Sequence, residues 1–191
     1  QRSYTSYEEP REVIFRIIVA DKDFVIHEVI FYEKPLIKLE RRGWARAIET
    51  FLNIDDNTRE KVLNTFYCPN DILEAKNDAM KIFYNLLDNE SIKLNDQNTK
   101  EVISFISICN VNTHTINDYF DGLYEISSKF THSCAPNIAC NSADKDDNNG
   151  PIYFEAIKNI KTGDMMTIDY LLSMESIMST SQRRAILKDK Y

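Results

Sequence analysis

The sequence predicts an α+β fold in which short strands flank a block of helices. Apolar and β-branched residues dominate the runs at 12–20 and 27–39, which is typical of strands. Between 41 and 109 the apolar residues recur at helical spacing, and after 110 the chain returns to short strand-like runs. The predicted order is therefore strands, a helical insert, more strands and a short terminal helix.

The helical insert contains its own start signals. Trp44 and Phe51 belong to a first apolar stripe at helical spacing. Asp71 precedes the clearest helix as a predicted N-cap, and Glu74 follows three residues later as the second half of a capping box. A further helix is expected to begin near Thr99. No Gly- or Pro-rich linker interrupts this block, so we expect it to pack on the flanking strands.

Polar turns divide the part of the chain that follows the insert. The asparagine- and aspartate-rich segment 144–150 ends in Asn-Gly, which favours a turn between two strands. The tetrapeptide KTGD at 161–164 predicts a second tight turn. The segment 180–191 is expected to form a short helix.

Composition narrows the class of protein. The chain has 191 residues, a net charge of −7 and an ordinary apolar content of 43%. The negative charge argues against direct nucleic-acid binding and would suit a basic peptide partner. No apolar stretch approaches the ~18 residues that span a membrane. Because the chain begins with Gln1, we expect a fragment of a longer protein. Its oligomeric state is left open.

The cysteines indicate a reducing compartment. Cys68, Cys109, Cys134 and Cys140 form no CxxC pair and no dense disulfide framework. We therefore expect free thiols and a location in the nucleus or the cytoplasm. The three histidines are scattered as well, so a complete zinc site within this sequence is not expected.

The run THSCAPN at 131–137 is the most distinctive segment of the chain. Taken alone, it is compatible with an ordinary loop that holds a hydrogen-bonded histidine and a small cysteine. A Cys–His hydrolase that uses Cys134 and His132 is a second reading. A spacing of two residues seldom places a thiol and an imidazole face to face, so that reading is disfavoured.

The sequence around this run resembles the SET domain family, and most closely its SET-and-MYND branch. The resemblance lies in FTHSCAPN at 130–137, a predicted hairpin at 138–157, Gly-Asp at 163–164, and TIDY at 167–170. No cysteine cluster of a MYND module lies between 40 and 60. The resemblance implies small β-sheets and a knot-like C-terminal segment. It divides the chain into N-terminal SET strands, a helical insert, the C-terminal SET core and the start of a post-SET segment, at 1–40, 41–109, 110–172 and 173–191.

The resemblance also implies an activity, that of an S-adenosylmethionine-dependent protein lysine N-methyltransferase. A protein or peptide lysine would be the substrate, with a histone tail as one candidate, which would make the protein a chromatin regulator. Lysine has a pKa near ~10.4, and only its neutral amine can attack the methyl group. A desolvated, aromatic channel lowers that pKa and aligns the amine.

Family roles carry over to matching positions of this sequence. Tyr170 and Tyr191 match the tyrosines of the lysine channel. The residues that match cofactor contacts are Arg16, Asn110, Ser128, Thr131, His132 and Tyr170. Cys134 matches a zinc ligand, but only together with post-SET cysteines that the sequence does not contain.

Three positions depart from the family pattern. A GxG turn is expected near 15–17, where this chain has Phe-Arg-Ile. Thr131 stands where the signature has asparagine, and His27 stands where a strand start has glycine. These departures leave an alternative open, namely a SET-like protein-interaction module with weak or absent activity.

Overall fold

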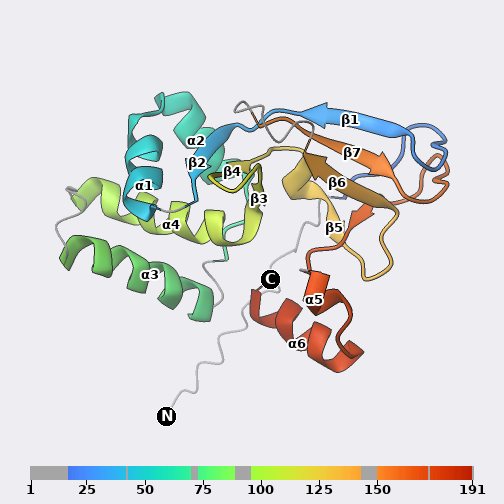
Figure 1. The fold of residues 1–191 in the computed structure, drawn as a ribbon. Coiled ribbons are helices and arrows are strands. Elements are labelled where there is room, and N and C mark those ends of the chain that lie inside the picture. The colour runs from blue at the N-terminus through green and yellow to red at the C-terminus, as the bar shows by residue number, and fades with distance from the viewer. Residues whose placement is uncertain are drawn as a thin grey trace, which may run out of the picture.

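The computed structural model describes residues 17–41, 43–69, 73–88, 96–142, 150–171 and 173–190. Helices form one side of the molecule and strands form the other, with the helices of the C-terminal segment below them (Figure 1). The α+β prediction is confirmed. Among the described residues, no helix is long and apolar enough to cross a membrane.

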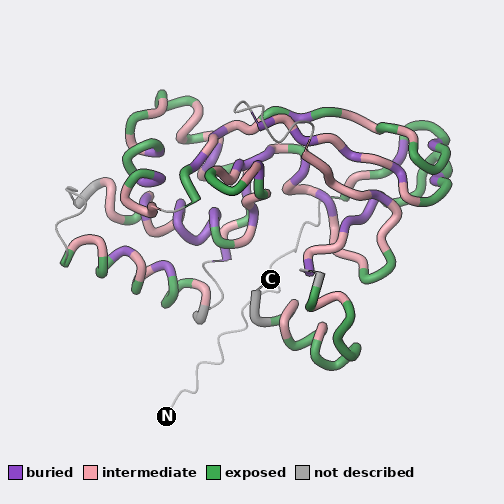
Figure 2. Tube along the Cα trace, in the orientation of Figure 1, coloured by how far each residue is buried: buried purple, intermediate pink, exposed green. Residues whose placement is uncertain are grey.

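The helical side is built around one central helix. It comprises α1 (Trp44–Asn53), α2 (Asp56–Thr65), α3 (Leu73–Asp88) and α4 (Asp96–Asn112). The interior of α4 is fully buried at Phe105, whose ring stacks on that of Phe51 with centroids 4.2 Å apart. Burial of such aromatic side chains explains why α4 is surrounded by the other helices. Most residues coloured as buried in Figure 2 belong to this core and to a second core among the strands.

The strands form two small antiparallel sheets. One has the order β1 (Val29–Glu33), β7 (Ile152–Ala156) and β6 (Ile138–Ser142). The other has the order β2 (Ile37–Glu40), β4 (Phe120–Leu123) and β3 (Thr113–Thr115). The first sheet covers the second core, in which Phe31, Phe130 and Phe154 pack ring against ring.

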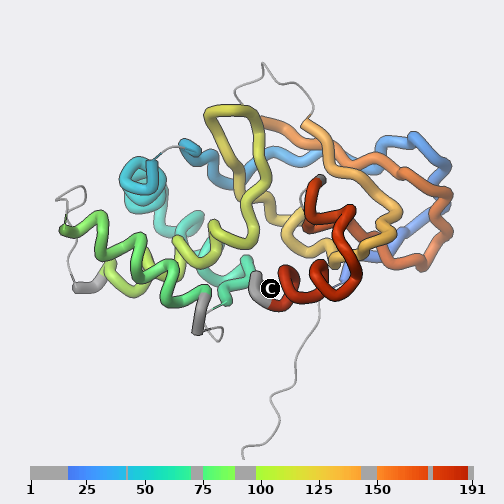
Figure 3. The backbone as a smooth tube through the Cα atoms, turned by 60° about the horizontal axis from the view of Figure 1, so that its bottom comes forward, coloured from blue at the N-terminus to red at the C-terminus, as the bar shows by residue number. Residues whose placement is uncertain are grey.

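The C-terminal part of the chain returns to the segment 131–137, the THSCAPN run, which we call the signature loop. β5 (Thr131–His132) pairs in parallel with β8 (Thr167–Ile168), directly after the 3₁₀ turn η1 (Ser127–Lys129). The chain then continues into α5 (Ser173–Ser176) and α6 (Thr180–Lys190), whose C-terminal end approaches the helical side (Figure 3). Contacts between α3 and α6 link the C-terminal segment to the helical side.

Several sequence expectations differ from the structure in detail. The described part of the predicted strand at 12–20 forms one isolated bridge, between Val19 and Met165, and no strand. The helix expected near Thr99 begins earlier, at Asp96. The predicted N-cap at Asp71 lies outside the described residues, whereas α2 is capped by Asp55, whose carboxylate accepts from the Thr58 amide at 3.0 Å.

His27 explains one departure from the family pattern. It has a φ of 71°, and no other non-glycine residue of the described chain has a positive φ. Glycine adopts this left-handed conformation without cost, whereas a side chain is strained there. The amide of His27 donates to the Ala156 carbonyl at 2.7 Å, and its Nδ1 lies 2.7 Å from Glu155 Oε1. The bend before β1 is thus retained although its glycine is not.

Buried polar groups fix the approach to the signature loop. The carboxylate of Glu33 accepts from the amides of Ile126 and Ser127 at 2.7 and 2.9 Å. The Ser127 hydroxyl contacts Nε2 of His114, and burial lowers the pKa of His114 to about 4. His114 is therefore neutral at pH 7, and this network ties η1 to β1 and β3.

Replacing His27 by glycine should relieve the backbone strain. Glycine and alanine both remove the contact with Glu155, so their difference reports the strain at positive φ, reduced by the larger conformational entropy of glycine in the unfolded chain. We expect His27→Gly to be more stable than His27→Ala by about 1 kcal/mol, measured by urea unfolding. A glycine variant less stable than the alanine variant would contradict the predicted strain, because the entropy cost of glycine would then exceed any strain it relieves.

Protonation of His114 should destabilise the fold. Because its folded pKa is lower than the ordinary 6.5, the unfolded chain binds this proton first, and stability falls as pH drops from about 6.5 to about 4. A shift of this size corresponds to roughly 3 kcal/mol at most. His114→Gln should flatten the pH dependence of the unfolding free energy in this window. An unchanged slope would contradict the assignment.

Candidate active site

A cavity of about 580 Å³ lies where the helical side meets the signature loop. Its walls come from the end of α2, the junction of α4 and β3, the segment from η1 to β5, and the segment that leaves β8. These segments are 64–67, 111–114, 127–132 and 168–170. Four parts of the chain that are distant in sequence therefore share one concave site.

Asn137 positions the two segments that carry the signature. Its side-chain amide donates to the Met165 carbonyl at 2.9 Å, and its Oδ1 accepts from the Thr167 amide at 2.8 Å. The Ser133 amide adds a bond to the Ile168 carbonyl at 2.8 Å. The last residue of THSCAPN thus continues the backbone pairing of β5 with β8 through its side chain.

His132 joins these segments at the cavity wall. Its Nδ1 accepts from the backbone amide of Tyr170 at 3.1 Å, across 38 residues of sequence. Burial lowers the pKa of His132 although the nearby Asp169 carboxylate raises it. The neutral imidazole then carries its proton on Nε2, which lies 3.1 Å from the sulfur of Cys134.

Tyr170 contributes both its backbone and its side chain. The phenol donates its proton to the carbonyl of Phe130, the residue that precedes β5. The ring centroid lies 5.4 Å from that of His132. Because the only hydroxyl proton is committed to Phe130, the phenol oxygen can act toward the cavity only as an acceptor.

Ser128 and Thr131 line the same cavity. The Ser128 hydroxyl donates to the Glu125 carbonyl at 2.9 Å, which stabilises the η1 turn. Thr131 pairs with Thr167 in the β5–β8 ladder and is half-buried. The structure therefore brings together Ser128, Thr131, His132 and Tyr170 as one group.

The other predicted site residues are placed differently. Asn110 is exposed on α4 and lines a separate cavity of about 230 Å³ with Trp44 and Asp121. Its role in cofactor binding stays a prediction, but the structure does not bring it to the cavity of His132. Arg16 and Tyr191 lie outside the described residues.

Two parts of the cavity wall were not predicted. Asn112, at the end of α4, lies in the cavity and is only 7% exposed. Phe66 and Tyr67, which follow α2, supply aromatic surface. Asn112 lies only two residues from Asn110, and its carboxamide bonds to the Tyr67 carbonyl, a contact over 45 residues that no local pattern indicates.

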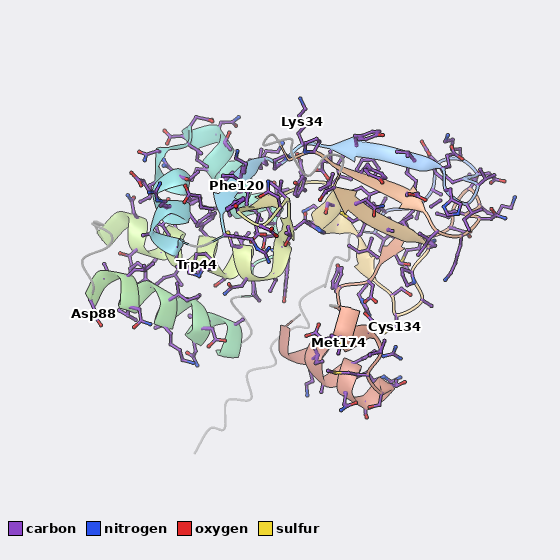
Figure 4. All side chains as sticks on the ribbon, in the orientation of Figure 1. Lys34, Trp44, Asp88, Phe120, Cys134 and Met174 are labelled. Carbon is purple, nitrogen blue, oxygen red and sulfur yellow. The ribbon has the colours of Figure 1, made fainter. Side chains whose placement is uncertain are left out.

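Cys134 is exposed in the loop between β5 and β6, close to α5 (Figure 4). Its thiol contacts His132, and no group of three metal-ligating side chains occurs within the described part of the chain. Structural zinc needs four ligands. The described residues therefore do not form a zinc site.

Comparisons with known proteins identify the family. The SET domain model matches residues 16–171. A protein of Acanthamoeba polyphaga mimivirus described as SET domain-containing is 27% identical over 177 residues, which is 87% of this chain and 66% of the viral protein. The crystal structure of the SET domain of LSMT bound to lysine and AdoHcy matches with a TM-score of 0.53 at 11% identity, over 85% of this chain and 49% of that one. The chain thus spans about two thirds of the viral relative and about half of the solved chain, and it belongs to the SET domain family.

Proposed function

We propose that this protein is an S-adenosylmethionine-dependent protein lysine N-methyltransferase. The observation that carries this proposal is the cavity in which His132 and Tyr170 meet, because the two residues come from separate segments held together by side-chain and backbone bonds. A cavity of about 580 Å³ falls in the range of roughly 300–1,000 Å³ that is usual for cofactor sites.

The cavity residues suit a nucleoside ligand. His132, Ser128 and Thr131 place polar groups on one wall, and the aromatic residues Phe66 and Tyr67 supply apolar surface on another. His132, whose pKa is lowered by burial, directs Nε2–H at the Cys134 sulfur and presents its ring to the cavity. These residues would hold the methyl donor, which when bound supplies an electrophilic methyl group on a sulfonium.

The same cavity suits a lysine side chain. Tyr170 presents a phenol oxygen whose proton is engaged by Phe130, so the oxygen can accept an N–H and orient the amine. Aromatic faces attract cationic nitrogen. Where the cavity removes the amine from water, the ammonium form is penalised and the neutral amine that reacts is favoured.

The relatives support the activity without fixing the substrate. The solved LSMT domain binds lysine and AdoHcy. We extend this to the present chain as a proposal, with a protein lysine as substrate, a histone tail as one candidate, and the nucleus or cytoplasm as location. The alternative of an inactive interaction module predicts no cofactor binding.

Cofactor binding is the first test of the proposal. Calorimetry with S-adenosylmethionine and AdoHcy should give micromolar affinity, and His132→Ala should weaken it at least tenfold, since the substitution removes a ring that lines the cavity and the bond to the Tyr170 amide. His27→Ala removes an imidazole whose side chain is 77% exposed and should leave the affinity unchanged. A wild-type protein that binds neither ligand would favour the interaction module.

Tyr170→Phe separates chemistry from binding. Loss of the phenol oxygen should lower methyl transfer to a lysine peptide library by about a hundredfold, while AdoHcy affinity stays nearly intact. Tyr84→Phe, at a 51% exposed position of α3, is the matched control. A parallel loss of transfer and affinity would mean that the phenol serves only to hold Phe130.

A further inference from the structure

Asn112 is a buried amide whose hydrogens are both engaged. Its Nδ2 donates to the Tyr67 carbonyl at 2.7 Å and to the Ile108 carbonyl at 2.8 Å. The first bond links α4 to the segment after α2, and the second lies within α4. The side chain is therefore fixed at the junction of two cavity walls.

These bonds also determine which way the amide points. Both neighbouring groups are carbonyl oxygens, which accept hydrogen bonds, so the nitrogen must face them. Oδ1 is then the remaining polar atom of the side chain, and no described residue donates to it. Asn112 is only 7% exposed and borders the cavity of His132 and Tyr170.

We propose that Oδ1 of Asn112 accepts a hydrogen bond from an amino group of a ligand in this cavity. The amino group belongs either to the target lysine or to the methyl donor, and both present the same N–H chemistry. This inference rests on the proposed function. It assigns the residue a role in binding and in selecting between ligands.

A fixed acceptor discriminates among amines. An unmethylated lysine offers N–H groups, whereas a trimethylated lysine has none and leaves this hydrogen bond unmade. Hydrogen bonds to charged groups contribute more than neutral ones. The geometry therefore favours ligands with free N–H groups by about tenfold or more.

Two substitutions separate this role from folding. Asn112→Leu removes both the acceptor and the donors. Asn112→Thr also removes the acceptor at that distance, but its hydroxyl can donate to the Ile108 carbonyl, as Ser107 and Thr113 do to carbonyls four residues before them. Asn85→Leu, at an exposed position of α3, is the matched control, and thermal unfolding confirms that each variant is folded.

The measurements distinguish the two sources of the amino group. For the lysine, affinities of Nα-acetyl-lysine methylamide and its Nε-trimethyl form are compared by NMR in the presence of AdoHcy. For the donor, AdoHcy is compared by calorimetry with analogues that lack the 6-amino or the α-amino group. In wild type the N–H-bearing member of one pair should bind about tenfold tighter, and both Asn112 variants should abolish that preference.

The outcomes separate this inference from the proposed function. If both Asn112 variants keep every preference of the wild type, or weaken all ligands equally, the residue is only structural and the inference is overturned. If wild type binds AdoHcy and lysine but shows no preference in either pair, the inference is overturned as well. If wild type binds neither AdoHcy nor lysine, the proposed function itself fails, and the inference with it.

Discussion

The candidate site depends on the contact between the signature loop and the segment that carries Tyr170. β5 and β8 pair over only two residues each, which would be a weak association by itself. The Asn137 carboxamide extends the pairing by bonding to the backbone of Met165 and Thr167, and the His132 imidazole adds the Tyr170 amide. Because these side chains satisfy backbone groups that would otherwise lack partners, the two segments are held in one register.

The cavity also requires that the helical side keep its place. The two cores are separate clusters, so the walls between them must be joined by specific contacts. Lys129 donates to the Thr65 carbonyl and lies over the Phe66 ring, 5.5 Å from its centroid. Asn112 holds the Tyr67 carbonyl from the other side. One bond ends on the last residue of α2 and the other on Tyr67, two residues later, so the segment between them is held as a wall of the cavity.

The sequence was sufficient for the features that depend on local pattern or on motif order. Apolar periodicity placed the helical insert, and THSCAPN with TIDY placed His132 beside Tyr170. The family pattern has glycine at the position of His27, and His27 does adopt the left-handed conformation that favours glycine. Asn112 could not be predicted because the bond that fixes it ends on a carbonyl 45 residues away in sequence. Asn110 was predicted from the family resemblance, whereas the structure places it at the separate cavity of Trp44 and Asp121. Asn110 and Asn112 both lie at the end of α4, and tertiary packing decides which of them faces the cavity of His132. The sequence motif contains no information on that packing.

The departures at Thr131 and His27 can be weighed by what each position does. Thr131 joins the β5–β8 ladder through its backbone, a role that any residue other than proline fills, so threonine leaves the fold intact. His27 retains its bend through the Ala156 carbonyl. Neither departure from the family pattern changes the side chains of His132 and Asn137, whose bonds to the backbone of Met165, Thr167 and Tyr170 hold the site together. Tyr170 and Asn112 combine two roles. The hydroxyl proton of Tyr170 and the amide protons of Asn112 bond to backbone carbonyls, which leaves the phenol oxygen and Oδ1 as acceptors. A cavity that presents such fixed acceptors is matched to ligands that carry N–H groups, which a methyl donor and a lysine amine both do.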